Sequence, residues 1–168
     1  MDLSSIMLAI NLAAPHISNP SVKWYGKIID RAALKGQMDP LIIISVITHE
    51  SHWNPNLISS DEKDLGLMQI RAKYSSIPED HLLNPATNIQ IGTALLKSNY
   101  NYCEKFLDRE PSYQEYGSCY AGLCKSKKRT CKPSKISNTI VKYAQCLEDS
   151  LVEQVSKDCS PWFNYEIN

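Results

Sequence analysis

The sequence predicts a single α+β domain that is mostly helical, with at most a small sheet. Its length of 168 residues suits one domain with a real core. Apolar residues recur at spacings of three and four in several segments, which is typical of helices packed on a common core. Residues 1–168 contain no repeat, low-complexity tract or linker, so we treat them as one domain.

Two helices are predicted before residue 37. A surface helix laid on the core is indicated by an apolar series at helical spacing, namely Leu3, Ile6, Met7, Ile10 and Ala14. This stretch has no basic region before it and makes a poor signal peptide, so any export signal is expected to have been removed. The second helix begins at Pro20 and ends near Gly36. Its apolar stripe is expected to comprise Trp24, Ile28, Ala32 and Leu34.

A third helix is predicted to begin at Pro40. Asp39 and Pro40 are typical of an N-cap followed by proline at the first helical position. The run LIIISVITHES is rich in β-branched residues, which favours a strand on propensity alone. Its length and its Asp-Pro start favour a helix that is buried on most sides. We therefore expect a helix with Glu50 in its last turn.

The middle of the chain is expected to combine loops with a long helix. Residues 53–65 are polar and rich in turn formers, so they should form a loop. GLMQI, at 66–70, could be a strand end or a tight turn into the core. Asn84 and Pro85 then begin a long helix. Its apolar positions are Ile89, Gly92, Leu96, Tyr100, Cys103 and Leu107.

After this helix we expect a shorter helix over 112–122, a basic loop over 124–133 and a final helix. The final helix has the clearest stripe in the chain, formed by Ile136, Ile140, Tyr143, Ala144, Leu147, Leu151 and Val155. The basic cluster could hold acidic peptides or phosphates, or be an exposed loop; it comprises Lys125, Lys127, Lys128, Arg129, Lys132 and Lys135. The tail over 156–168 carries Cys159, Trp162 and Phe163, and a disulfide is expected to pin it.

The six cysteines are Cys103, Cys119, Cys124, Cys131, Cys146 and Cys159. An even, clustered set indicates disulfides and an oxidising compartment. Zinc is the competing interpretation, but there is no C-x-x-C pair, and no histidine lies among or after the cysteines. Free structural thiols are the third. Cys124 and Cys131 flank the basic loop and could close it.

Charge and hydropathy argue against several classes of protein. Eighteen basic and eighteen acidic residues balance, so nothing in the net charge points to nucleic acid or to an anionic membrane. No apolar run approaches the roughly 18 to 20 residues that span a bilayer. We expect no metal, no cofactor and no nucleic-acid partner, and we expect a monomer.

The stretch ITHESHWNPN, at 47–56, carries the clearest chemical signal. It reads H-E-S-H from His49 to His52, whereas zinc proteases use H-E-x-x-H. Ser51 lacks the G-x-S-x-G turn of a serine nucleophile. A carboxyl group at the end of an apolar helix is shielded from water and lies near the negative end of the helix dipole, and both effects raise its pKa. Glu50 could therefore donate a proton to a glycosidic oxygen. A solvated glutamate is the alternative.

Four motifs in order resemble the soluble lytic transglycosylase and goose-type lysozyme superfamily. ESHWNP at 50–55, followed by GLMQI at 66–70, is similar to its E-S-x-[FW]-x-P and G-L-M-Q-[ILV]. LLNPATNIQIGTALL at 82–96 is similar to its L-x-[DN]-P-x-x-N-I-x-x-G-x-x-x-L. CYAG at 119–122 and TIVKYAQ at 139–145 are similar to its A-Y-N-A-G and E-T-x-x-Y-V. The resemblance covers about residues 40–147.

The resemblance implies a lysozyme-like fold and cleavage of the β-1,4 bond between N-acetylmuramic acid and N-acetylglucosamine in peptidoglycan. Glu50 would protonate the leaving oxygen and then act as a base. The attacking group would be the sugar's own 6-hydroxyl in a lytic transglycosylase and water in a lysozyme. Asn88 would support the fold, and Tyr143 would orient the acid. The residues implied to contact the glycan are Ser51, Met68, Gln69, Tyr120 and Tyr143.

Departures from the family pattern leave the second step open. KDL stands at 63–65 where the family usually has G-A-x, and Arg71 follows GLMQI. An inverting hydrolase needs a second carboxylate at about 6.5 to 9.5 Å from the first. Asp61, Glu62 and Asp64 are the candidates, although they could instead form a solvated acidic loop. If they line the cleft, we expect a preference for deacetylated sugars, which carry free amines.

Two functions of different classes follow from the sequence. The first is an exported enzyme, periplasmic or secreted, that cleaves peptidoglycan. The second is a non-catalytic glycan-binding or inhibitor-like domain on the same fold. The presence of Glu50 favours the enzyme, because a domain without catalysis has no need of that acid.

Overall fold

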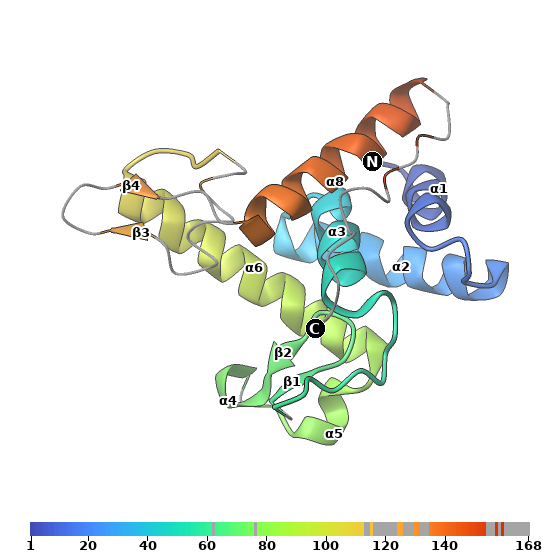
Figure 1. The fold of residues 1–168 in the computed structure, drawn as a ribbon, viewed down its shortest axis with the longest axis horizontal. Helices are drawn as coiled ribbons and strands as arrows, with labels where there is room; N and C mark the ends of the chain where they lie inside the picture. Colours follow the sequence, from blue (N-terminus) through green and yellow to red (C-terminus); the bar gives the residue numbers. More distant parts are fainter. Residues whose placement is uncertain are drawn as a thin grey trace.

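The computed structural model describes residues 1–61, 63–75, 77–112, 115, 124–125, 130–131, 135–153, 157 and 159 (Figure 1). The described helices are α1 (Leu3–Ala13), α2 (Asn19–Gly36), α3 (Pro40–Ser51), α4 (Ala72–Ser75), α5 (Glu79–Leu82), α6 (Pro85–Leu107) and α8 (Lys135–Glu153). The described strands are β1 (Asp64–Leu65), β2 (Ile70–Arg71), β3 (Cys124–Lys125) and β4 (Thr130–Cys131), which form two separate two-stranded antiparallel sheets. The predicted class, mostly helical α+β, is confirmed.

Helix α3 lies at the centre of the fold and is buried over most of its length. The Asp39 carboxylate accepts a hydrogen bond from the Leu41 N–H at 2.9 Å, and Pro40 takes the first helical position, which confirms the predicted N-cap. Every residue from 41 to 48 is buried, as expected for a helix that is apolar on nearly all sides. Ser45 and Thr48 donate their hydroxyl hydrogens to carbonyls one turn earlier, so neither polar group is left unsatisfied. The predicted preference for helix over strand is confirmed.

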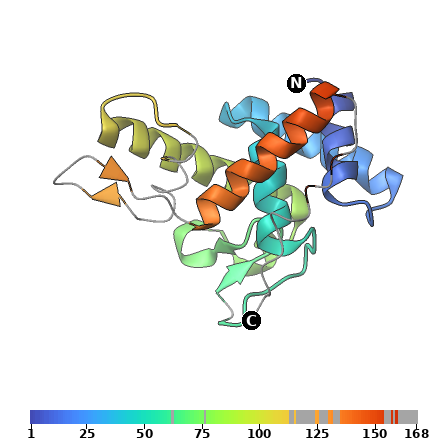
Figure 2. The same cartoon turned by 45° about the horizontal axis from the view of Figure 1, so that its top comes forward.

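Three helices pack against α3. Helix α8 crosses α3 in both views, and α1 and α2 cover its other side (Figures 1 and 2). The predicted α1 and its stripe are confirmed, with Ile6 and Ile10 fully buried. In α8, the predicted residues Ile140, Tyr143 and Leu147 are buried against the core.

The apolar stripe predicted for α2 is wrong for Trp24 and Leu34 but right for Ala32, which is buried, and the helix and its end at Gly36 are confirmed. Trp24 is 46% exposed and Leu34 is 73% exposed. The face that contacts the core is rotated around the helix and is formed by Val22, Tyr25, Gly26, Ile29, Ala32 and Ala33. Two interleaved apolar series occur in this helix, and only packing selects which one is buried.

The segment GLMQI forms both structures that the sequence left open. Gly66 to Gln69 make a four-residue turn, and Leu65 pairs with Ile70 across the β1–β2 ladder. Gly66 has φ of +73°, and a Cβ there would lie 2.5 Å from the Asn88 Nδ2. Only glycine fits this position without strain. The predicted loop over 53–65 is wrong in part, because Ile58 and Leu65 form a β-bridge within it.

Helix α6 packs against this turn through Asn88 and Gly92 and extends away from it. The Asn84 side chain accepts from the Thr87 N–H at 3.1 Å, which confirms the predicted cap. Ile89, Gly92 and Leu96 are buried, as predicted. The short helices α4 and α5, which the sequence did not predict, lie between β2 and α6.

Cys159 is joined to α8 by a disulfide with Cys146, which confirms that the tail is pinned at this residue. Cys103 is also disulfide-bonded, and no cysteine in the described ranges is free. Cys124 and Cys131 are backbone partners in the β3–β4 register, so the basic loop predicted over 124–133 is wrong in part. The helix predicted over 112–122 falls almost entirely outside the described residues, as do Trp162, Phe163 and most of the basic cluster.

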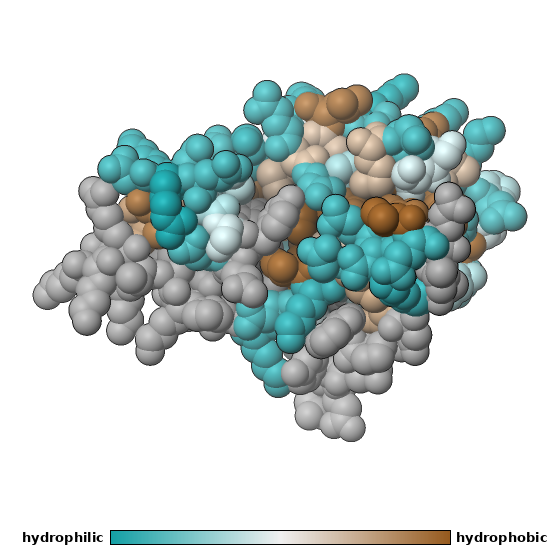
Figure 3. Space-filling view, turned by 90° about the horizontal axis from the view of Figure 1, so that it is seen from above, coloured by the Kyte–Doolittle hydropathy of each residue, from teal (hydrophilic) through white to brown (hydrophobic). Residues whose placement is uncertain are grey.

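One face of the molecule is mainly hydrophilic over its described residues (Figure 3). On the face drawn in Figure 3, apolar residues reach the surface in small areas separated by hydrophilic ones. Within the ranges given above, no helix is both long enough and apolar enough to cross a bilayer.

Candidate active site

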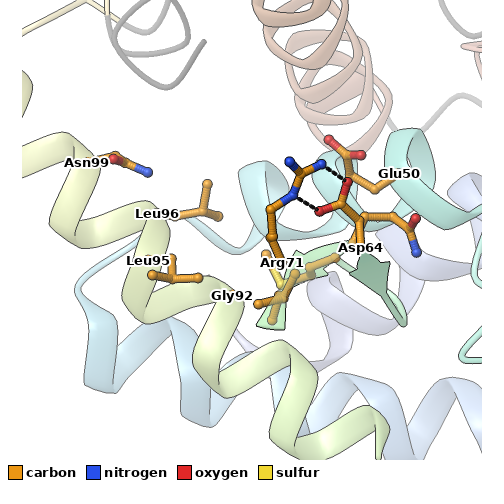
Figure 4. A pocket seen from close by; sticks show the side chains of 10 residues that line it. Glu50, Asp64, Arg71, Gly92, Leu95, Leu96 and Asn99 are labelled. Carbon is orange, nitrogen blue, oxygen red and sulfur yellow. Dashed lines mark hydrogen bonds and ion pairs between the residues drawn. The ribbon is translucent and has the colours of Figure 1, made fainter. Parts of the chain in front are cut away.

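Glu50 projects from the last turn of α3 into a cavity of about 580 Å³ (Figure 4). Helix α3 is capped by His52, which adopts the left-handed conformation (φ 51°) and donates its N–H to the Thr48 carbonyl. The described residues that line the cavity are Glu50, Asp64, Met68, Gln69, Ile70, Arg71, Gly92, Leu95, Leu96 and Asn99. They come from α3, the β1–β2 hairpin and α6, so the cavity exists only where these three elements meet.

The environment of Glu50 favours its protonated form. Burial, and after it the negative charge of Asp64, raises the pKa of Glu50 from 4.5 to about 7. The carboxyl group therefore carries a proton in a large fraction of molecules near neutral pH, while it still faces a cavity. This is the arrangement that the sequence predicted for a proton donor.

Asp64 and Arg71 form an ion pair beside Glu50. They lie opposite each other in the β1–β2 register. The Arg71 Nε and Nη2 each donate to one Asp64 oxygen at 2.8 Å, a two-point contact that Figure 4 shows next to the Glu50 carboxyl. Both carboxylate oxygens of Asp64 are thus engaged by one guanidinium group.

The other acidic candidates are placed differently. Asp61 is exposed, and its Oδ2 lies 3.1 Å from the Lys63 Nζ and 3.6 Å from Arg71 Nη2. Hydrogen bonds from Ser59 and Lys63 lower the pKa of Asp61 to about 2. Glu62 lies outside the described residues. Because Lys63 and Arg71 offset the charges of Asp61 and Asp64, the basis for a preference for deacetylated sugars is weakened.

Gln69 and Met68 form the wall that continues from the ion pair. The Gln69 Nε2 donates to the carbonyls of Gly66 at 2.8 Å and Leu57 at 3.1 Å, which uses both of its N–H groups. Its Oε1 is then the atom that can accept a hydrogen bond from a ligand. Met68 is 3% exposed and fills the space left by Gly92, where a Cβ would lie 2.4 Å from the Met68 sulfur.

Asn88 holds the turn in place from within the core. It is fully buried, and its Oδ1 accepts from the Met68 N–H at 2.7 Å. Its Nδ2 donates to the carbonyls of Leu65 and Leu82, each at 2.8 Å. One side chain therefore satisfies three buried backbone groups, and it links the hairpin to α5 and α6. This confirms the structural role predicted for Asn88.

Of the remaining predicted contacts, Ser51 and Tyr143 are not among the described residues that line the cavity. Ser51 is buried and donates its hydroxyl hydrogen to the Ile47 carbonyl at 3.1 Å. Tyr143 is buried on α8, and Tyr120 lies outside the described residues. Contact between these three residues and a glycan stays a prediction. Trp53 packs edge-on against Tyr25 and donates to the Thr48 hydroxyl, so it belongs to the core.

Several lining residues were missed at the level of sequence. Arg71 was noted only as a departure from a family pattern, and its pairing with Asp64 depends on the hairpin register. Leu95 and Asn99 lie three and seven residues after Gly92, so they share its face of α6, and that spacing could have identified them. Among the described residues, no group of three or more histidine, cysteine or acidic side chains could hold a metal.

Comparisons with known proteins show which family and which proteins the chain is similar to. The family model described as "Transglycosylase SLT domain" matches residues 27–133, which is more than half of the chain. The chain is also similar to proteins named membrane-bound lytic murein transglycosylase C. It is 29% identical to that of Cronobacter sakazakii and 30% identical to those of Salmonella paratyphi B and Salmonella typhimurium, each over 101 residues. These matches cover 53% of this chain but only 28% of each relative.

Proposed function

This chain belongs to the transglycosylase SLT domain family, and from that premise we propose that it cleaves the β-1,4 bond between N-acetylmuramic acid and N-acetylglucosamine in bacterial peptidoglycan. The observation that carries the proposal is Glu50, a carboxyl group with a pKa of about 7 that opens into a 580 Å³ cavity. The similar proteins are named as lytic murein transglycosylases. A domain that only binds glycan has no use for a carboxyl group kept protonated in its cleft.

The proposed mechanism uses Glu50 twice. Protonated Glu50 donates its proton to the glycosidic oxygen, and the C1–O bond breaks to leave a positively charged sugar ring. The Glu50 carboxylate then takes the proton from the 6-hydroxyl of the same muramic sugar, whose oxygen attacks C1. The product is a 1,6-anhydro sugar, and Glu50 regains its starting proton.

The Asp64–Arg71 pair favours this route over hydrolysis. A hydrolase that inverts C1 needs a second carboxylate that acts as a base and activates water. Asp64 is the described carboxylate that shares the cavity with Glu50, and both of its oxygens already accept hydrogen bonds from Arg71. We therefore propose a lytic transglycosylase, and keep a lysozyme with Asp64 as base as the second candidate.

Product analysis tests the reaction type. Digestion of purified sacculi should release muropeptides that end in 1,6-anhydro-muramic acid, lighter by one water than the hydrolysis products. Mass spectrometry of the unreduced digest distinguishes the two, and borohydride treatment adds a check because only reducing ends react. Products with reducing muramic ends would overturn the transglycosylase assignment while leaving Glu50 as the acid.

The pH profile tests the electrostatic role of Asp64. Asp64→Asn removes a negative charge that raises the Glu50 pKa and frees the Arg71 cation, and both changes lower that pKa. Since catalysis needs protonated Glu50, the alkaline limb of kcat/KM should move to lower pH by roughly half a unit. Asp80→Asn, on an exposed side chain of α5, is the matched control and should leave the limb in place. An unchanged or upward-shifted limb in Asp64→Asn would contradict this electrostatic account.

The contacts with the glycan are proposed from the same geometry. The Gln69 Oε1 would accept a hydrogen bond from the N–H of an acetamido group, and Met68 would form an apolar wall. Tyr143 is proposed to orient Glu50. We also propose that the protein acts outside the cytoplasm, because the Cys146–Cys159 disulfide is typical of an oxidising compartment.

A further inference from the structure

A second concave site lies on the opposite side of α6 from Glu50. Its cavity has a volume of about 670 Å³ and is formed by the C-terminal half of α2 and the middle of α6. The two helices approach closely at Gly36 and Thr93. A Cβ added to Gly36 would lie only 2.8 Å from the Thr93 Cγ2. Gly92 lines the Glu50 cavity and Thr93 lines this one, so neighbouring residues of one helix face the two sites. We call the second site the α2–α6 groove.

The groove is basic. Arg31 and Lys35 reach it from α2 and Lys97 from α6, and none of the described residues that line it is acidic. Arg31 and Lys35 are exposed and form no ion pair with any described residue. Like charges four residues apart on a helix repel each other, so an anion bound between them would stabilise the helix.

The positive charge continues along α2 beyond the groove. Lys23 and Lys27 precede Arg31 at the same four-residue spacing, and both are exposed. This row is set by the sequence, while the groove is formed at its C-terminal end only, where α6 lies beside α2. Lys23 and Lys27 thus carry the same charge as Arg31 and Lys35, but only Arg31 and Lys35 line the groove.

The rest of the groove suits a peptide. Gln37, Gln90 and Asn101 offer side-chain amides, which can donate to and accept from a peptide backbone. Thr93 also lines the groove; it is 1% exposed, and its buried hydroxyl has no hydrogen-bond partner among the described residues. Ala32 and other small apolar side chains leave room for methyl groups.

We propose that the α2–α6 groove binds the acidic peptide that peptidoglycan carries on its muramic sugars. This inference rests on the proposed function, because that polymer is the substrate proposed for the Glu50 cavity. Residues four apart on a helix are separated by about 6 Å along its axis, so Arg31 and Lys35 can each meet one carboxylate. A flat membrane surface would not enter a concave site, and a phosphate polymer would use only the N–H donors of its amide groups and not their acceptor oxygens.

Direct binding on the full chain tests the groove. The protein carries Glu50→Gln, so that no probe is cleaved, and the probe is the free acidic stem peptide released from sacculi by an amidase. Arg31→Gln combined with Lys35→Gln should weaken binding about tenfold, because two charge-assisted contacts are lost. Lys23→Gln combined with Lys27→Gln is the matched control: it removes the same charge from the same helix outside the groove. The control should change the affinity by less than about twofold.

Three further probes separate the possible ligands. We call the Arg31→Gln and Lys35→Gln double variant the groove variant, and the protein without these two changes its parent. Peptide-free glycan strands should bind both equally. Poly(glycerol phosphate) and vesicles of phosphatidylglycerol should bind weakly and respond equally to both double variants, because only bulk charge is involved. Equal loss of stem-peptide binding in the two double variants would overturn the groove, as would no binding by the parent. A groove-dependent affinity for either phosphate probe above that for the peptide would overturn the peptide assignment.

Activity assays distinguish a failure of the groove from a failure of the proposed function. In the chain with Glu50 intact, the groove variant should lose about tenfold in kcat/KM on intact sacculi relative to peptide-free strands. If the protein cleaves neither substrate, the proposed function fails while the binding result still decides the groove. If both are cleaved and this ratio is unchanged, the groove fails and the proposed function stands.

Discussion

Glu50→Gln should reduce cleavage of purified peptidoglycan by about 100- to 10,000-fold, because general acid–base catalysis contributes about that much and glutamine can neither give nor take the proton. The change keeps the shape of a side chain that lines the cavity. Binding of glycan strands should therefore survive. Release of soluble muropeptides measures the first result, and cosedimentation with sacculi measures the second.

The stability of this variant provides an internal check on the Glu50 pKa. The folded value of about 7 lies above the ordinary value of 4.5, so between these pH values the folded state keeps a proton that the unfolded state has lost. The free energy of unfolding therefore falls as pH rises through this window. Glutamine does not ionise, so the variant should exceed the wild type in stability above pH 7 by on the order of 2 kcal/mol, and the charge-linked part should vanish below pH 4.5. Thermal unfolding at pH 4 and pH 8 measures the difference.

Glu104→Gln is the matched control for Glu50→Gln. Glu104 is exposed on α6 and lines neither cavity. The same chemical change there should leave activity and the pH dependence of stability as in the wild type. Full activity in Glu50→Gln would remove the basis of the proposed function.

Asn88→Leu should destabilise the fold by roughly 3 to 5 kcal/mol, because it leaves three buried backbone groups without partners. These groups are the Met68 N–H and the carbonyls of Leu65 and Leu82. The loss should also displace the turn that carries Met68 and Gln69, so activity should fall even below the unfolding transition. Chemical denaturation measures the first effect, and assays on the folded fraction measure the second.

Asn88→Asp separates the contributions of the two ends of this side chain. Aspartate keeps an acceptor for the Met68 N–H but places a carboxylate oxygen against the carbonyls of Leu65 and Leu82. We expect a large loss at neutral pH that is partly recovered in acid, where a protonated carboxyl can donate once. Asn56→Asp, in the exposed part of the loop after α3, is the control and should be close to neutral. If Asn88→Asp lost little stability at neutral pH, Asn88 would not be the residue that holds the turn.

Local signals in the sequence were sufficient for α3 and α6, two of the three elements that form the cavity. The Asp39 cap, the following proline and the length of the apolar run predicted α3 and placed Glu50 in its last turn, as the structure has it. Asn84 and Pro85 did the same for α6. Each of these features depends on residues within one or two turns of each other, so no knowledge of distant contacts was needed.

Other features depended on packing between distant segments. In α2, the series with Trp24 and Leu34 and the series with Tyr25 and Ile29 are both apolar, and the positions of α1, α3 and α6 decide which is buried. The Asp64–Arg71 pair requires the β1–β2 register, and the α2–α6 groove requires two helices that are far apart in sequence. No local pattern contains that information.

By itself, the sequence determined that this protein is mostly helical, that Glu50 ends a buried helix, and that the GLMQI segment follows it. The tertiary structure alone decided that Asp64 is paired with Arg71 beside Glu50. It also decided that α6 lies between the Glu50 cavity and the basic α2–α6 groove. The physical reason is range. Caps and periodicity act over a few residues, whereas burial and charge pairing depend on which distant segments meet.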